Sequence, residues 1–156
     1  MQRLGIRART ATLLLAVLLG IAFGIGGYTF VYAKGYSYLT DDPAACANCH
    51  VMLPQFQSWS KAPHHAVASC NDCHTPSGFF AKYGVKALNG FNHSLAFTTG
   101  RFHEPIRANR MNQRVAREAC TKCHAELVQS ISHGAALDTE AAPDCTHCHG
   151  SVGHPH

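Results

Sequence analysis

Residues 46–50 read Cys-Ala-Asn-Cys-His, and this Cys-x-x-Cys-His pattern decides the fold because it occurs four times in the chain. The later copies read CNDCH at 70–74, CTKCH at 120–124 and CTHCH at 145–149. Together the four copies use all eight cysteines of the 156-residue chain. Random placement of these cysteines and of the twelve histidines would give far fewer than one copy, so the pattern marks one kind of site repeated four times.

The repeated pattern is the attachment site of a c-type haem. The two cysteine sulfurs form thioethers with the porphyrin vinyl groups, and the adjacent histidine is placed to bind the iron. Structural zinc does not require a histidine after every cysteine pair, and four disulfides would not require this spacing, so both are weaker interpretations. We predict four covalently bound haem c groups, attached through Cys46, Cys49, Cys70, Cys73, Cys120, Cys123, Cys145 and Cys148.

Residues 11–33, ATLLLAVLLGIAFGIGGYTFVYA, form an apolar stretch without a charge. As a helix this stretch would be roughly 35 Å long, enough to cross a hydrocarbon core of about 30 Å. Three arginines and no acidic residue precede it, which places residues 1–10 in the cytoplasm and residues 34–156 in the periplasm. A cleaved signal peptide is the alternative, since residues 31–33 resemble a cleavage site, but the stretch is long for that role. We predict an uncleaved transmembrane anchor.

The composition describes a small domain with little apolar core. Charged residues make up 14% of the chain and the net charge is +4 with neutral histidines, which gives no reason to expect a nucleic-acid partner. A domain of this size builds only a modest core, which four haems would supplement. Prolines and glycines interrupt the spaces between the motifs. We predict a mostly α fold with extensive loops: a single N-terminal transmembrane helix followed by a small tetrahaem cytochrome c domain.

One segment of the predicted domain, residues 78–102, has the periodicity of an amphipathic helix. Apolar side chains recur there at three- and four-residue steps: Phe80, Ala87, Leu88, Phe91 and Leu95. A polar stripe follows the same helical spacing: Lys82, Lys86, Asn89 and His93. Two interpretations remain open and are compatible, an ordinary helix under the haems and a helix that lies at the membrane surface.

A low-spin haem iron needs a second axial ligand, usually a histidine or a methionine. Apart from the initiator, the chain contains only two methionines, Met52 and Met111. Eight histidines lie outside the ends of the motifs: His64, His65, His93, His103, His133, His147, His154 and His156. Their spacing alone does not assign any of them to a haem.

The first motif continues to Met52, so that Cys-x-x-Cys-His-x-Met directly follows the predicted anchor. With three further motifs behind it, this arrangement resembles the NapC/NirT/NrfH family of membrane-anchored tetrahaem quinol dehydrogenases. Asn71-Asp72 inside the second motif and the run from Lys82 to Ser94 look most similar to the NrfH branch, the small subunits of cytochrome c nitrite reductases. The resemblance covers nearly the whole chain and is strongest over residues 36–100.

The resemblance implies a set of iron ligands, with the haems numbered in the order of their motifs. It implies that Met52 binds the iron of haem 1 in place of His50. The other motif histidines then bind their own haems: His74 for haem 2, His124 for haem 3 and His149 for haem 4. It also implies two distal histidines, His154 for haem 2 and His65 for haem 3, with the adjacent His64 as a rival to His65. Haem 4 would take its distal ligand, a lysine, from a partner subunit.

The resemblance further implies a quinol site beside haem 1, lined by Lys86 and, at the position of an acidic residue in one family member, by His93. Quinol oxidation releases two electrons and two protons, whereas a haem accepts one electron, so the site needs a basic group to receive protons. A histidine with a pKa near neutrality suits that role. Two alternatives without a role in a quinol site remain open: Lys86 as a surface lysine, and His93 as a surface histidine or an axial ligand. We interpret His103, His133, His147 and His156 as surface residues.

The resemblance implies a membrane-anchored quinol dehydrogenase in the cytoplasmic (inner) membrane of a bacterium. It would oxidise menaquinol from the membrane quinol pool and pass the electrons to the catalytic subunit of a periplasmic multihaem nitrite reductase. Nitrite reduction itself would take place in that partner. Two alternatives remain: a NapC-like donor to a nitrate reductase or to several periplasmic partners, and a non-enzymatic electron-transfer cytochrome without a quinol site.

Overall fold

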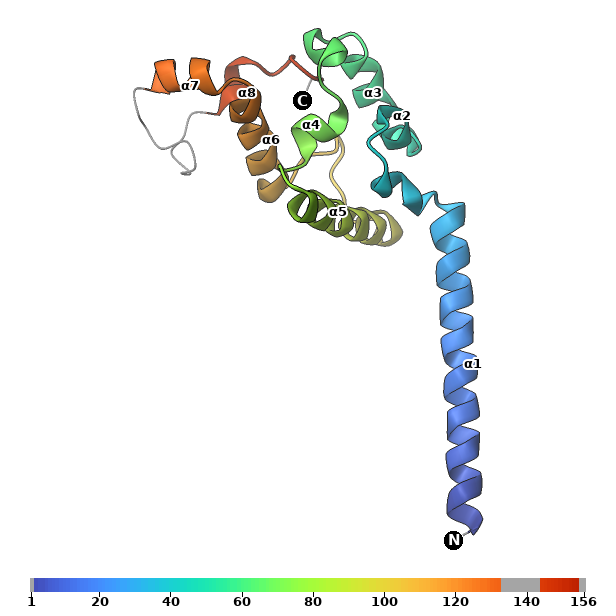
Figure 1. Ribbon diagram of the computed structural model, residues 1–156. Helices are drawn as coiled ribbons and strands as arrows, with labels where there is room; N and C mark the ends of the chain where they lie inside the picture. Colours follow the sequence, from blue (N-terminus) through green and yellow to red (C-terminus); the bar gives the residue numbers. More distant parts are fainter. Residues whose placement is uncertain (1, 133–143, 155–156) are drawn as a thin grey trace. The chain divides into compact units, whose positions relative to one another are not determined.

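The computed structural model describes residues 2–132 and 144–154, and helices dominate it (Figure 1). Within these two ranges there is no β-strand, so the predicted mostly α fold is confirmed. The chain divides into two compact units, one that ends at Tyr36 and one that begins at Ser37.

The first unit consists mainly of α1 (Gln2–Tyr32), one uninterrupted helix. Its 27 residues from Ile6 to Tyr32 are exposed and are apolar enough to cross a membrane. At 1.5 Å per residue this stretch is roughly 40 Å long, which exceeds a hydrocarbon core of about 30 Å. Near its C-terminal end the rings of Tyr28 and Tyr32 stack with centroids 5.8 Å apart, and tyrosines are enriched where a helix meets the membrane surface. The helix begins well before residue 11.

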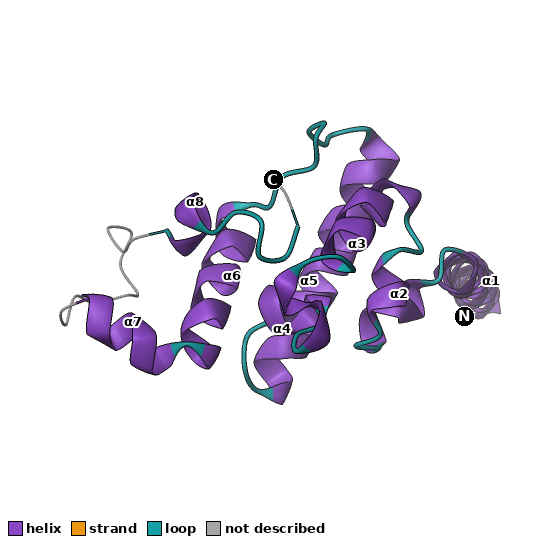
Figure 2. Cartoon of the chain, turned by 90° about the horizontal axis from the view of Figure 1, so that it is seen from above, coloured by secondary structure: helices purple, strands orange, loops and turns teal. Residues whose placement is uncertain are grey.

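The second unit is a set of mostly short helices joined by loops (Figure 2). Its short α-helices are α2 (Pro43–Cys46), α3 (Leu53–Trp59), α4 (Cys70–His74) and α8 (Cys145–Cys148). The 3-10 turns are η1 (Gly35–Leu39), η2 (His50–Met52) and η3 (Pro63–Ala66), of which η1 begins in the first unit. The longer helices are α5 (Phe79–Thr99), α6 (Arg110–Cys123) and α7 (Ala125–Ser132).

The second, third and fourth Cys-x-x-Cys-His motifs lie on helical turns, which brings their two cysteines to one side of the helix. Polar side chains begin these helices by binding backbone N–H groups that have no intrahelical partner. The Asp144 carboxylate accepts a hydrogen bond from the Thr146 amide at the start of α8. At α4, Asp72 Oδ2 accepts hydrogen bonds from the Ser69 backbone amide and hydroxyl, at 2.8 and 2.7 Å.

The polypeptide builds very little apolar core of its own. Among the residues whose burial is described, the only buried hydrophobic side chains are Val115 in α6 and Val128 in α7. Part of the contact between α5 and α6 is polar: the amide groups of Asn89 and Asn112 exchange two hydrogen bonds, at 3.1 and 3.0 Å. Such a sparse core is what the motifs predict for a domain that packs around large prosthetic groups.

Candidate haem and quinol sites

The motif cysteines and histidines are arranged in a way that fits haem attachment. None of the eight cysteines forms a disulfide in the structure. No group of three or more histidine, cysteine, aspartate or glutamate side chains in the described ranges is arranged to hold a metal ion such as zinc. The histidines instead face one another in pairs, and that arrangement suits an iron with two axial ligands.

The first histidine pair joins the second motif to the C-terminal segment. The imidazole rings of His74 and His154 are stacked, with centroids 5.9 Å apart and planes only 9° from parallel. A metal–imidazole bond is about 2 Å long, so two rings on opposite sides of one ion have centroids roughly 6 Å apart. His74 and His154 thus have the separation of two ligands to one haem iron, and they are the pair that the sequence predicted for haem 2.

The second histidine pair joins the third motif to η3. The rings of His64 and His124 have centroids 6.1 Å apart, but their planes are 84° apart and so nearly perpendicular. His64 Nδ1 lies 3.2 Å from the Val152 carbonyl oxygen. Because a carbonyl only accepts, Nδ1 carries the proton and Nε2 is left as the metal-binding nitrogen, as in many histidine ligands.

His65, which the sequence favoured as the distal ligand of haem 3, lies in a different environment. Its ring packs edge-on against the Trp59 ring, with centroids 4.7 Å apart. The structure therefore brings the rival, His64, opposite His124. Both histidines fall within η3, a turn of only four residues, and its 3-10 geometry directs adjacent side chains away from each other. Spacing from Cys70 could not reveal which of the two faces the third motif.

The remaining predicted iron ligands are not paired in this way. His149 follows α8 and is exposed, and no second histidine ring faces it among the described residues. Met52 ends η2, which also contains His50, so the geometry leaves both candidate ligands of haem 1 at the same turn. His103 and His147 are exposed, whereas His133 and His156 lie outside the described residues.

The two residues predicted for the quinol site lie seven positions apart on α5, nearly in line along the helix. Lys86 is only 5% exposed. Its Nζ donates hydrogen bonds to the Thr40 carbonyl and to Asp41 Oδ1, each at 2.7 Å, and lies 5.4 Å from the centre of the Tyr83 ring. A buried ammonium requires such partners, because burial without them is very unfavourable.

Asp41 pairs with two lysines of α5. Its second carboxylate oxygen forms an ion pair with Lys82, one turn before Lys86. Hydrogen bonds from Lys82 and then from Lys86 hold the pKa of the Asp41 carboxyl below its usual range. The carboxylate is therefore ionised throughout the neutral pH range, and it balances two positive charges that would otherwise repel each other along α5.

His93 pairs with Tyr38. The Tyr38 hydroxyl lies 2.8 Å from His93 Nδ1, and the two ring centroids are 6.1 Å apart. His93 is exposed, yet the atoms packed around its ring desolvate it and lower its pKa, so the imidazole is neutral at pH 7. Burial raises the pKa of Tyr38 to about 12, which keeps its hydroxyl protonated. A neutral imidazole held through one nitrogen can accept a proton at the other.

Sequence reasoning missed three residues of this site: Tyr38, Thr40 and Asp41. One weak signal was present, because Lys82 and Lys86 are like charges at i and i+4 and a nearby counterion would relieve their repulsion. The acidic pair Asp41-Asp42 precedes the first motif, but nothing in the sequence indicates that it folds back onto residues 45 positions away.

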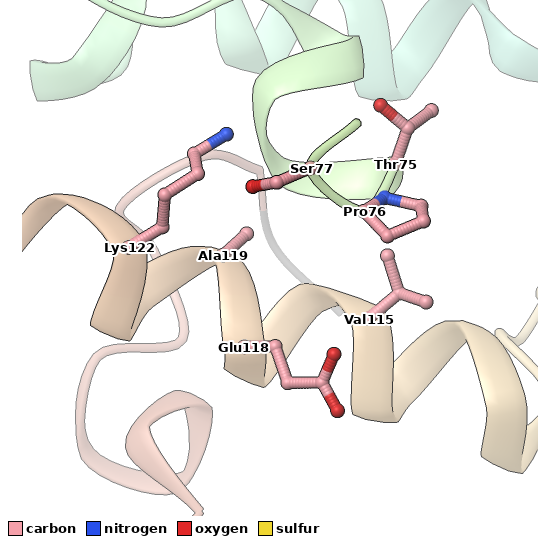
Figure 3. Close-up of a pocket in the computed structure, with 7 residues that line it drawn as sticks. All are labelled: Thr75, Pro76, Ser77, Val115, Glu118, Ala119 and Lys122. Atoms are coloured by element: carbon pink, nitrogen blue, oxygen red, sulfur yellow. The ribbon is translucent and has the colours of Figure 1, made fainter. Parts of the chain in front are cut away.

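A cavity of about 280 Å³ lies elsewhere, between the loop that follows the second motif and α6 (Figure 3). It is lined by Thr75, Pro76, Ser77, Val115, Glu118, Ala119 and Lys122. The Lys122 ammonium also donates a hydrogen bond to the Asp72 carbonyl at 3.2 Å. Neither Lys86 nor His93 borders this cavity, which adjoins the second and third motifs.

Comparison with known proteins identifies the relatives of this arrangement. Residues 7–156 match the family model described as the NapC/NirT cytochrome c family, N-terminal region. The cytochrome c-type protein NrfH of Wolinella succinogenes is 39% identical over 146 residues, covering 88% of this chain and 82% of that protein. The cytochrome c nitrite reductase subunit NrfH of Nitratidesulfovibrio vulgaris is 33% identical over 138 residues, with the same coverage.

A solved structure resembles the chain as well. It is the crystal structure of the cytochrome c nitrite reductase NrfHA complex bound to the HQNO inhibitor. A chain of that complex is 31% identical, and the match covers 93% of this chain and 87% of the other with a TM-score of 0.58.

Proposed function

We propose a function for this chain, which belongs to the NapC/NirT cytochrome c family. It is a membrane-anchored tetrahaem cytochrome c that oxidises menaquinol and supplies the electrons to a nitrite reductase. The electrons would pass to the catalytic subunit of a periplasmic multihaem nitrite reductase, where nitrite is reduced. The names of the two NrfH relatives and the composition of the NrfHA complex support this partner. HQNO supports a quinol substrate, since its fused rings and ring oxygens resemble those of a naphthoquinol.

Our assignment of ligands to the four haems follows the paired histidines. Haem 2 is held by His74 and His154 and haem 3 by His124 and His64, in place of the His65 that the sequence favoured; the ring separations support both pairs. Met52 binds haem 1 and His149 binds haem 4. When bound, each haem accepts and releases one electron at a time. The exposed His149 is consistent with a distal ligand from the partner, for which we propose the lysine implied by the family.

In this proposal Lys86 and His93 bind the quinol and manage its charge. Two N–H groups of the Lys86 ammonium are bonded to Thr40 and Asp41, and the third donates to a quinol oxygen. His93 accepts the two quinol protons one at a time at Nε2 and, because it is exposed, passes each to water, while its Nδ1–H is donated to the Tyr38 oxygen. The two electrons would leave one at a time to haem 1. Lys86 thereby stabilises negative charge that develops as the proton leaves, and His93 acts as the general base.

We assign residues 11–33 to the membrane, residues 1–10 to the cytoplasm and residues 34–156 to the periplasm of a bacterium. The length and apolar composition of α1 support the anchor, and the arginines before it support this orientation. Covalent haem attachment supports the same side of the membrane, because c-type haems are attached to their cysteines on the exported side.

The observation that carries the quinol site is the buried Lys86, whose ammonium is bonded to Thr40 and Asp41 just before the first motif. Substitution Lys86→Met should slow haem reduction by a soluble naphthoquinol by roughly a hundredfold while all four haems stay attached. Lys61→Met, at an exposed lysine, is the matched control and should leave the rate unchanged. Parental rates in Lys86→Met would remove Lys86 from the reaction.

A further inference from the structure

The segment Ser37–Asp42, here called the post-anchor segment, connects α1 to the first haem motif and is bonded to α5 along its length. The Tyr38 hydroxyl contacts His93, and the Thr40 carbonyl accepts from Lys86. The Tyr83 hydroxyl reaches the Leu39 carbonyl at 3.5 Å. Both side chains that we assign to the quinol site are therefore held by this segment.

Asp41 is the most highly connected residue of the post-anchor segment. Its carboxylate pairs with Lys82 and with Lys86, and Asp41 Oδ1 also accepts from Asn71 Nδ2 at 3.0 Å. Asn71 lies inside the second Cys-x-x-Cys-His motif, and the same amide group reaches the Thr40 carbonyl at 3.3 Å. One carboxylate thus ties together the post-anchor segment, α5 and the helix that carries haem 2.

The two lysines depend on Asp41 to different degrees. The Lys86 side chain is 6% exposed, whereas the Lys82 side chain is 26% exposed and Asp41 itself is 51% exposed. Water can therefore solvate Lys82 if the carboxylate is removed, but it reaches Lys86 very poorly. Without Asp41, Lys86 would retain one neutral acceptor, the Thr40 carbonyl, and no counterion among the described residues.

We propose that Asp41 is a positioning residue of the quinol site, which holds the Lys86 ammonium through an ion pair and directs its remaining N–H group toward the quinol. The inference rests on the proposed function and adds a residue that does not touch the substrate. The charged and titratable groups around Lys86 are Asp41 from the post-anchor segment, Lys82 and Tyr83 from α5, and Cys46 from the first motif. Once haem is attached, Cys46 is a thioether and does not titrate, so Asp41 supplies the only negative charge in this set.

Substitution Asp41→Asn tests this role, because it removes the charge and keeps the size and the hydrogen-bonding capacity of the side chain. In the full-length chain in membranes, HQNO affinity and naphthoquinol oxidation should fall on the order of tenfold. A purely structural role would lower haem content and would weaken HQNO binding equally with and without Lys86.

Two further variants isolate the effect. Asp42→Asn makes the same charge change at the neighbouring residue, whose side chain caps α2 through the Ala44 amide, and asparagine caps equally well. It should match the parent. In a Lys86→Met background, Asp41→Asn should cause no further loss of HQNO affinity, because residues that act through one another are not additive.

The outcomes separate this inference from the proposed function. Equal losses from Asp41→Asn with and without Lys86 would overturn the positioning role, as would parental HQNO affinity in Asp41→Asn. If Lys86→Met itself leaves HQNO binding unchanged, the quinol site is wrong and the role of Asp41 falls with it. If Asp41→Asn does not accumulate with four haems, Asp41→Ser replaces it: it also removes the charge, and parental HQNO affinity in that variant counts against the inference.

Discussion

Two regions of the molecule hold their side chains in opposite ways. One is the haem-ligand region, the facing pairs His74–His154 and His64–His124. The other is the contact between the post-anchor segment and α5. In the haem-ligand region, His74 and His124 are exposed and face their partner rings with centroids close to 6 Å apart. In the other region, Lys86 and His93 are bonded directly to residues of the post-anchor segment. In the first region a haem would have to link the paired histidines, whereas in the second the polypeptide itself supplies the bonding partners.

This difference shows which interactions make each site rigid. The histidine pairs are brought together by helices that share almost no apolar core, so the haems themselves must stabilise that geometry. The residues that we propose for the quinol site are preorganised by ion pairs and hydrogen bonds, so little further ordering would be needed when substrate binds. Substitutions should therefore affect haem spectra in one region and substrate chemistry in the other.

The largest expected effect is on the chemistry of the α5 region. His93→Gln keeps a hydrogen-bonding side chain but cannot accept a proton, and loss of a general base costs roughly a hundredfold or more in rate. Naphthoquinol oxidation measured by stopped-flow should fall accordingly, with unchanged haem spectra. His103→Gln, at an exposed loop histidine, is the matched control. A rate close to the parent's in His93→Gln would mean that another group receives the proton.

The same histidine sets a pH dependence with a definite sign. Desolvation lowers the pKa of His93, so the folded chain binds its proton less readily than the unfolded chain does. The resulting contribution to stability is complete above the ordinary value of about 6.5 and is lost as the pH falls through the lowered pKa. Quinol oxidation should follow the neutral imidazole and decline only below about pH 6.5. This decline at low pH, the acid limb of the profile, should disappear in His93→Gln. An acid limb with the same midpoint in that variant would show that another group is responsible for the decline.

The next effect separates the two adjacent histidines of the haem-ligand region. His64→Ala should remove a distal ligand of haem 3 and lower electron transfer by at least the roughly 10- to 100-fold that loss of an outer-shell partner costs at metal sites. Nearly perpendicular imidazoles give a low-spin EPR signal with a larger maximal g-value than parallel ones. His64→Ala should remove the large-g signal and preserve that of the parallel His74–His154 pair.

His65→Ala is the control for that experiment, since its ring packs on Trp59 rather than opposite a motif histidine. It should retain every low-spin signal. The opposite result, with signal loss in His65→Ala and none in His64→Ala, would restore the ligand that the sequence favoured.

A smaller effect is expected where the two regions meet. Asn89→Ala leaves the half-buried Asn112 amide without its partner across α5 and α6, which should lower the free energy of unfolding by about 1–3 kcal/mol. Thermal unfolding of the haem-loaded chain measures this change. Asn89→Ala combined with Asn112→Ala should be less destabilising than the sum of the two single changes, because both partners of the bond are then absent. Strict additivity would show that the two amides do not interact in solution.

The same comparison explains what could be predicted from the sequence. Cys-x-x-Cys-His is a local pattern with fixed chemistry, so the c-type cytochrome character, the anchor and the mostly α fold followed from short stretches read in isolation. The bond between Asp41 and Lys86 joins residues 45 positions apart, and no local pattern specifies such a pairing. His64 and His65 differ only in which way a four-residue turn directs them, a difference of backbone geometry that spacing cannot carry.

The smallest expected effect tests how closely the post-anchor segment packs on α5. A glycine inside a helix costs about 0.5–1 kcal/mol relative to alanine, so Gly90→Ala should stabilise the chain by up to that amount. A Cβ atom at residue 90 would meet the Tyr38 ring at 3.5 Å, an ordinary contact, and Gly90→Ala should keep the parental pH profile. A leucine there is too large and should displace Tyr38 from His93, which changes the acid limb of quinol oxidation. At Gly84 a Cβ would meet nothing within 4 Å, so Gly84→Leu is the matched control. An altered acid limb in Gly84→Leu but not in Gly90→Leu would contradict the contact between Tyr38 and α5.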